Sequence, residues 1–260
     1  MTPPAGNAMT AAVRTRLEKA AADNGFDLGP TPDKDWIGFA SSHAPLRIWL
    51  TARGEGLFLA AVSQPNVLRG LASHGTAFQS PLPPGSCGAR GVADFTSLHR
   101  LLRRAFLLSR TLPDELLRTF ERQAAAMPRA TEAERLVVQR VGQNVFRQGL
   151  LDYWEGRCAV TGLATKDILR ASHIKPWADC EADAERLDVY NGFLLAPHLD
   201  CVFDHGFVTI TDDGSMLVSP HLLAADRAIL GLDVPLRMRS LADGHRAYLP
   251  WHRENVFRSA

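Results

Sequence analysis

The sequence has little cysteine, only four lysines and almost no net charge. Its four cysteines form no Cys-x-x-Cys pair, which argues against a disulfide framework and a four-thiolate zinc knuckle, so no structural zinc is expected. No apolar run approaches the ~20 residues that span a bilayer, and the N-terminus lacks the apolar core of a secretory signal. These absences predict a cytoplasmic protein with reduced thiols and no membrane partner.

The composition is that of an ordinary globular protein. Hydrophobic residues make up 46% and charged residues 22% of the 260 residues, which is enough to bury a core in one large domain or two ordinary ones. The basic and acidic residues nearly cancel, 29 against 28. A polyanionic partner would therefore have to bind a local patch, because the whole-molecule field is weak.

The N-terminal part alternates between helical and strand patterns. Residues 9–23 consist largely of helix-forming side chains and precede an Asn24-Gly25 stop, which predicts a first helix. Short apolar runs between residues 35 and 62 predict a meander of strands, and the proline- and glycine-rich residues 78–91 predict a surface loop. Further along, Asp212-Asp213-Gly214 between two apolar runs predicts a hairpin turn.

A helical region is expected from residue 94 to about Trp154, with breaks near Pro113 and Pro128 and an N-cap at Thr131. It is rich in arginine. Five acidic residues accompany ten arginines between residues 97 and 147, a local excess of five positive charges that could follow a phosphate backbone or simply form solvated helix faces. The ten are Arg100, Arg103, Arg104, Arg110, Arg118, Arg122, Arg129, Arg135, Arg140 and Arg147.

Residues 158–206 carry four motifs in a fixed order. They are Cys158-x-x-Thr161-Gly162, Ser172-His173-Ile174-x-Pro176-Trp177, Asn191-Gly192, and His198-x-Asp200-x-x-Phe203-Asp204-x-Gly206. This order resembles the HNH endonuclease family. The resemblance covers residues 131–222, with a similar ending at 252–258, and does not extend to residues 1–125. It implies a ββα-metal nuclease domain that cleaves DNA with a divalent metal, Mg²⁺ or Mn²⁺, in a bacterial restriction or defence role.

The residue types suit phosphodiester hydrolysis, which needs an activated water and a cation near the phosphate. His173 is expected at a strand end, where an imidazole that titrates near neutrality can act as the general base. Asn191 lies in a turn that enters a strand, and its amide can hydrogen-bond the backbone of the loop that carries His173. Among nearby basic residues, Arg140, Arg147, Arg170 and Lys175 are the expected DNA contacts.

Asp200 and Asp204 are the expected metal ligands. They are four residues apart, which places both carboxylates on one helix face, a geometry suited to a hard cation. The spacing of the resembled family points to the same two positions. His198 begins the same helix and is a further candidate, either as a ligand or as a catalytic contact to phosphate. Many members of that family have a metal-binding Asp where this chain has Ser172, which leaves the full ligand set open.

The expected fold is α+β. An N-terminal domain, residues 1–125, would combine a helix, a small sheet and arginine-rich helices, and residues 126–260 would form the nuclease domain with its lead-in helix and tail. Three alternatives stay open: a DNA-binding module whose site has lost its metal, a nuclease that acts on RNA, and an N-terminal half that recruits the nuclease through protein contacts. Cleavage of both DNA strands by one active site requires a homodimer or two successive nicks, and both are open.

Overall fold

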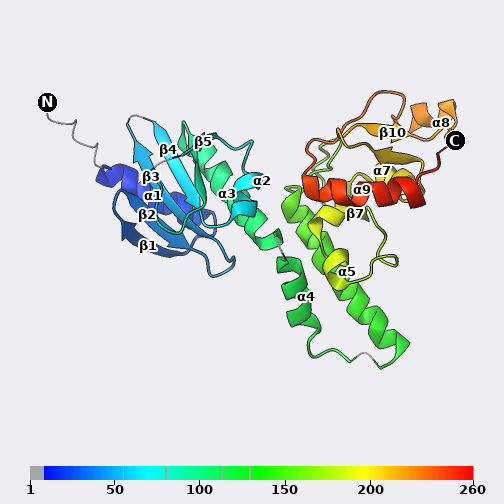
Figure 1. Cartoon of the computed structure of the whole chain (residues 1–260), viewed down its shortest axis with the longest axis horizontal. Coiled ribbons are helices and arrows are strands. Elements are labelled where there is room, and N and C mark those ends of the chain that lie inside the picture. The colour runs from blue at the N-terminus through cyan, green and yellow to red at the C-terminus, as the bar shows by residue number, and fades with distance from the viewer. Residues whose placement is uncertain (1–8, 55, 80, 113, 129, 260) are drawn as a thin grey trace. The chain divides into compact units, whose positions relative to one another are not determined.

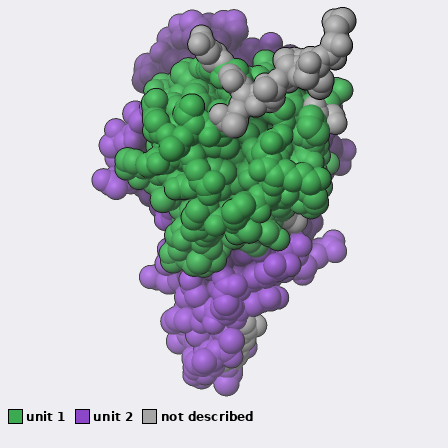
Figure 2. Space-filling model, turned by 90° about the vertical axis from the view of Figure 1, so that its left-hand side faces the viewer, with its two compact units in different colours: residues 1–113 green, residues 114–260 purple. Residues whose placement is uncertain are grey.

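The computed structural model describes residues 9–54, 56–79, 81–112, 114–128 and 130–259. The chain divides into two compact units, Met1–Pro113 and Asp114–Ala260, which are coloured separately in Figure 2. Each unit contains both helices and strands (Figure 1), so the fold is α+β as the sequence predicted.

The N-terminal unit is built on one antiparallel sheet with the strand order β1-β2-β3-β4-β6-β5. Three helices pack against this sheet, and α3 contacts both of the others. Trp36, Trp49 and Leu59 lie in an apolar cluster on one face of the sheet, with Leu82 packed against it. The elements are α1 (Ala11–Asp23), β1 (Leu28–Asp33), β2 (Trp36–Ala40), β3 (Arg47–Arg53), β4 (Leu57–Val62), α2 (Pro65–Gly70), β5 (Thr76–Phe78), β6 (Gly88–Val92) and α3 (Phe95–Thr111).

Part of the expected surface loop is a strand. The sequence prediction left residues 78–91 without regular structure, but β6 pairs with β4 on one side and β5 on the other. Glycine suits this strand because there is little space for side chains: a Cβ atom at Gly88 would lie 2.3 Å from Leu68, and one at Gly91 would lie 3.1 Å from both Leu57 and Leu59. The glycines that indicate a loop in the sequence thus allow β6 to pack closely against its neighbours.

The C-terminal unit begins with two helices and continues through small sheets to a final helix. Helix α5 begins with a capping box, in which Thr131 and Glu134 bond each other's backbone N–H groups, as the expected N-cap at Thr131 requires. The expected hairpin turn at Asp212-Asp213-Gly214 joins β9 to β10. The elements are α4 (Glu115–Ala124), α5 (Glu132–Tyr153), β7 (Arg170–His173), α6 (Asp183–Arg186), the 3-10 helix η1 (Val189–Asn191), β8 (Gly192–Leu195), α7 (Pro197–Asp204), β9 (Val208–Ile210), β10 (Met216–Val218), α8 (Ala224–Ile229) and α9 (Asp243–Asn255).

Helix α4 belongs to the C-terminal unit, whereas the division expected after residue 125 placed it in the N-terminal one. Leu116 and Phe120 on α4 are buried. Both lie against glycines of α5, since a Cβ atom at Gly149 would lie 2.2 Å from Leu116 and one at Gly142 would lie 3.4 Å from Phe120. This close helix packing explains why the division falls before α4.

Candidate active site

The candidate site is built from two short strands and the helix that follows them. Strand β7 pairs antiparallel with β8, with His173 opposite Gly192, and α7 packs against β7. The buried Cys158 fixes the start of α7, because its Sγ atom accepts the backbone N–H groups of Thr161 (3.4 Å) and Ala196 (3.3 Å). The Cys-x-x-Thr-Gly motif therefore connects the loop before β7 to the N-terminus of α7.

His173 ends β7, and its ring is held on both sides. The ring stacks on Phe146 of α5 at a centroid distance of 3.8 Å, and Trp177 meets it edge-on at 5.8 Å. Nε2 lies 2.9 Å from the carbonyl oxygen of Arg186, which can only accept, so Nε2 carries the hydrogen. Burial lowers the pKa of His173 to about 4. The ring is thus neutral near pH 7, with its second nitrogen, Nδ1, as the basic one.

Arg186 organises the loop beside His173, a role that the sequence did not indicate. Its side chain donates to the carbonyl oxygens of Trp177 (3.1 Å) and Cys180, and to the carboxylate of Asp183 (3.1 Å). The backbone of the same residue accepts the hydrogen of His173. No residue type is required to supply a carbonyl, so the sequence carries no signal for this contact.

Asn191 is fully buried in η1, and its amide bonds the backbone of the loop that follows His173. Its Oδ1 accepts the backbone N–H of Lys175 at 2.8 Å, and its Nδ2 donates to the carbonyl oxygens of Lys175 and Glu185, both at 3.1 Å. These contacts join the two ends of the loop that lies between His173 and Asn191. Removing the amide would leave several buried backbone groups unpaired.

Asp200 and Asp204 lie one turn apart on α7, and Ser172 is beside them. The Ser172 hydroxyl donates to Asp204 Oδ1 at 3.1 Å and also stabilises the Asp200 carboxylate. Burial raises the pKa of both carboxyls, and the negative charge of Asp200 raises that of Asp204 further. The positive charge of Arg170 opposes this shift at Asp200. A divalent cation would relieve the repulsion between the two carboxylates.

Asp204 and His173 line the same pocket, which has a volume of about 320 Å³. Trp177 and the buried His252 of α9 line it as well. His252 donates from Nε2 to the carbonyl of Phe203 at 3.2 Å, and its Nδ1 accepts the Thr209 hydroxyl at 3.0 Å. It therefore holds the end of α7 that carries Asp204. In the sequence, His252 belongs to the ending at 252–258 that is similar to that of the HNH family, but this similarity assigned no role to His252.

His198 lies apart from these groups. It is exposed and lines a different pocket, together with Cys201, His205 and residues of α8. Positions 198 and 200 point in different directions on a helix, because neighbours on one face are three or four residues apart. Within the described residues, no three His, Cys, Asp or Glu side chains gather as a metal site. The structure thus brings together Asp200 and Asp204 but not His198.

The four expected DNA contacts differ in what they bind. Arg147 donates to the carbonyl oxygens of Leu169 (2.6 Å) and Lys166 (3.1 Å), so it stabilises the loop before β7. Lys175 pairs with Glu185 at 2.9 Å, and its side chain is only 11% exposed. Arg140 and Arg170 are exposed, with no hydrogen bond or ion pair to another described residue. Only these two remain available to a phosphate backbone.

The ten arginines of the basic region are divided between the two units. Four lie on α3 in the N-terminal unit, and Arg118 and Arg122 lie on α4 in the other. Arg135, Arg140 and Arg147 lie on α5, while Arg129 is outside the described residues. Because both units contribute, the charge excess in the sequence does not correspond to one structural element.

Comparison with known families agrees with this architecture. The model of the HNH endonuclease family matches residues 158–211, which include β7, β8 and α7. No curated protein matches the chain. Among the described residues, no helix is both long and apolar enough to cross a bilayer.

Proposed function

Since residues 158–211 form a domain of the HNH endonuclease family, we propose that the protein is a metal-dependent endonuclease that hydrolyses DNA. The observation that carries this proposal is the setting of His173. Its Nε2–H is bound to a carbonyl, which leaves Nδ1 as the basic atom, and His173 lines a pocket that Asp204 also lines. A neutral imidazole with one ring nitrogen unprotonated, in a pocket that a carboxylate also lines, can take the proton of an attacking water.

In the proposed reaction, His173 Nδ1 takes the proton from the water that attacks phosphorus. The Arg186 carbonyl then stabilises the imidazolium, because it faces the N–H on the opposite side of the ring. The stacked Phe146 keeps the ring in one orientation, and Asn191 holds the adjoining loop. Fixed positions of this kind lower the entropic cost of bringing base and water together.

The carboxylates of Asp200 and Asp204 would hold the divalent cation. Their chemistry fits Mg²⁺ or Mn²⁺, since Mg²⁺ in such sites is bound by one or two carboxylates and completes its shell with water and substrate phosphate. When bound, the cation supplies positive charge for the phosphoryl group and the departing 3′-oxygen. His198 faces another pocket, so it is not proposed as a ligand of this cation; it is proposed instead as a contact to a neighbouring phosphate of the backbone.

Binding to the DNA backbone is assigned to Arg140 and Arg170, the two expected contacts whose guanidinium groups are exposed. The positive charge of Arg170 opposes the rise in the pKa of Asp200, so Arg170 is within electrostatic range of the proposed cation site. A restriction or defence role completes the proposal. A DNA substrate predicts affinity that falls steeply with salt.

The proposal is tested by incubating supercoiled plasmid with the full chain, with Mg²⁺, Mn²⁺ or chelator. His173→Ala is the active-site variant, and His221→Ala, which removes an exposed histidine of the same unit, is the control. We expect metal-dependent nicking by the wild type and the control, and loss of at least two orders of magnitude in His173→Ala. Methylated and unmethylated plasmids tested in parallel address the restriction role, and single-stranded DNA and RNA at equal salt address the substrate.

One rival has a specific observation in its favour. Ser172 places a neutral hydroxyl beside the carboxylates, where many members of the resembled family have a metal-binding Asp. If the site holds no metal for this reason, the chain would bind DNA without cleaving it. In that case the wild type would be inert with every metal and would still bind duplex DNA. Preferential cleavage of RNA would instead refute the choice of substrate while keeping the reaction.

A further inference from the structure

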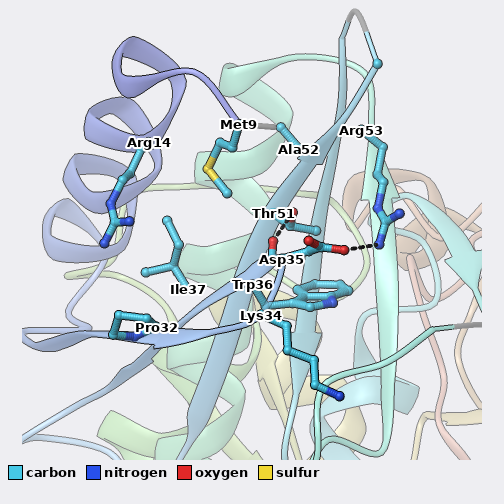
Figure 3. A pocket seen from close by; sticks show the side chains of 11 residues that line it. Met9, Arg14, Pro32, Lys34, Asp35, Trp36, Ile37, Thr51, Ala52 and Arg53 are labelled. Carbon is cyan, nitrogen blue, oxygen red and sulfur yellow. Dashed lines mark hydrogen bonds and ion pairs between the residues drawn. The ribbon is translucent and has the colours of Figure 1, made fainter. Parts of the chain in front are cut away.

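A second pocket lies in the N-terminal unit, at the end of the sheet where β2 begins and β3 ends (Figure 3). It has a volume of about 370 Å³. Its described lining includes three basic side chains, Arg14, Lys34 and Arg53, and one acidic side chain, Asp35. The basic groups come from three elements, helix α1, the turn between β1 and β2, and strand β3. Together these groups give the described lining of the pocket a net positive charge.

Arg53 is the unusual member of this group. Its Nε and Nη2 atoms are buried, and neither has a hydrogen-bond partner among the described residues. These two nitrogens form one edge of the guanidinium, the edge that binds two acceptor oxygens in parallel. Asp35 forms a long ion pair with Arg53 (Figure 3), but its Oδ2 is 3.8 Å from Nη2, which is too long for a hydrogen bond. Unpaired donors of this kind are costly, and because the Arg53 side chain as a whole is 38% exposed, a small adjustment of the guanidinium would let a ligand in the pocket supply the missing acceptors.

Lys34 has a backbone that its residue type does not favour. Its φ is +53°, in the left-handed region, in a turn where Asn or Gly would be easier to accommodate. The Thr51 hydroxyl holds this turn by donating to the carbonyl of Asp35 at 2.6 Å. Lys34 thus adds a cation to the lining of the pocket, and backbone strain of this kind is common at functional sites.

We propose that this pocket binds a backbone phosphate of the nucleic-acid substrate, with Arg53 as the main ligand and Lys34 as a supporting cation. The guanidinium fork matches two phosphate oxygens, and the net positive lining favours an anion over a neutral ligand. Arg14 contributes less, because its Nε is paired with Glu18 at 2.9 Å. The inference rests on the proposed function, and it gives the N-terminal unit a role in holding the strand that the other unit cleaves.

The test measures binding of a short fluorescent DNA duplex to the full chain by anisotropy, in chelator, so that no cleavage is needed. Arg53→Met is expected to weaken binding about tenfold, and to reduce the slope of log Kd against log salt by about one. Asp35→Asn is expected to tighten binding, because it removes the negative charge beside the phosphate. Lys19→Met, which removes an exposed cation of α1 outside the pocket, is the matched control and should bind like the wild type.

Lys34→Asn guards against a change that merely unfolds the unit. Asparagine accepts a positive φ more readily than lysine, so this variant should melt no lower than the wild type and yet bind DNA more weakly. Weaker binding with unchanged or higher thermal stability has no explanation in misfolding. If Lys34→Asn bound the DNA duplex as tightly as the wild type, Lys34 would not be a supporting cation of the site.

Two results would overturn the inference. If Arg53→Met bound like the wild type, the pocket would make no contact with DNA. If Asp35→Asn weakened binding, Asp35 would be the structural partner of Arg53. A further arm adds inorganic phosphate at constant ionic strength; because the guanidinium fork binds the oxygens of any phosphate, phosphate should compete with the duplex for the wild type and should have less effect on Arg53→Met. Plasmid cleavage by the wild type is scored separately, so failure of the nuclease proposal and failure of this inference are distinguishable.

Discussion

A histidine that acts as a base must be neutral and must have one ring nitrogen free, and the surroundings of His173 provide both conditions. Burial lowers its pKa to about 4, and the Arg186 carbonyl takes the hydrogen of Nε2. We therefore expect kcat/KM to rise with pH through about 4 and to be level near neutrality, since the neutral form dominates above the pKa. An ordinary histidine would still be titrating near pH 6.5.

Cleavage of a fluorescent duplex at saturating metal, followed against pH, tests this expectation. The same profile is expected for His221→Ala. Titration of the His173 ring by NMR in the metal-free protein gives the pKa of this residue. Agreement with the pH at which the rate rises would assign that rise to His173 and not to the carboxylates of α7. If the rate were half-maximal near pH 6.5 and the His173 ring titrated at the same pH, burial would not lower its pKa, and the ring would be exposed to water during catalysis.

Ser172 provides a second test at the scale of one residue. It is 2% exposed, and it lies against two carboxylates whose pKa values are raised. Ser172→Asp would add a third carboxylate there, which should lower the free energy of unfolding by about 3 kcal/mol in chelator because a buried charge is left unpaired. Mg²⁺ or Mn²⁺ should restore the loss, since a ligand that binds only the folded state raises its stability.

Thermal melts across a metal titration measure this effect, with Ser172→Ala as the control. The alanine variant loses only one hydrogen bond, about 1 kcal/mol, and should respond to metal no more strongly than the wild type. If Ser172→Asp were destabilised equally with and without metal, the two carboxylates of α7 would not be part of a cation site.

At the scale of elements, the contact between β8 and α5 sets the position of His173. Gly192 lies opposite His173 in the strand pair, and a Cβ atom there would lie 2.4 Å from Phe146, the ring on which His173 stacks. It would also lie 2.9 Å from the Ser172 carbonyl, which is backbone and cannot rotate away. Gly192→Ala should therefore lower the free energy of unfolding by about 1–3 kcal/mol and reduce cleavage further than the lost stability explains.

The matched control is Gly38→Ala, also a glycine in a strand. A Cβ atom at Gly38 has no neighbour nearer than 3.4 Å, so this variant should fold and cleave nearly normally. Urea unfolding gives the stability of both variants, and cleavage is measured where both are fully folded. Equal stability for the two variants would mean that α5 can move away from β8 without cost.

The sequence predicted elements whose signals are local. Helix α5 has its cap at Thr131, and the β9–β10 hairpin has its turn residues, so both appear where expected. Strand β6 was missed because its glycines indicate a loop, and only the side chain of Leu68 shows why they are needed. For the candidate site, His173, Asn191 and Asp204 lie in three short motifs that follow one another in the sequence. Arg186 acts through its carbonyl and His252 through tertiary packing, which no local pattern encodes.

At the scale of the whole molecule, the division into two units before α4 predicts which fragment folds. A fragment of residues 114–260 keeps α4 on α5, whereas a fragment of residues 126–260 loses the buried Leu116 and Phe120 and exposes the glycine-lined face of α5. Burial of each such side chain contributes about 1.5–3 kcal/mol. The shorter fragment should thus be less stable by several kcal/mol, a large part of the stability of an ordinary domain.

Urea unfolding of the two purified fragments, monitored by tryptophan fluorescence, measures this difference. If the nuclease proposal is right, the 114–260 fragment should also retain cleavage at high concentration, because His173, Asp200 and Asp204 all lie within it. It should bind duplex DNA more weakly than the full chain, since it lacks the pocket around Arg53. Equal stability of the fragments would place α4 outside the cooperative unit. Equal DNA affinity of the 114–260 fragment and the full chain would limit recognition to the unit that carries His173.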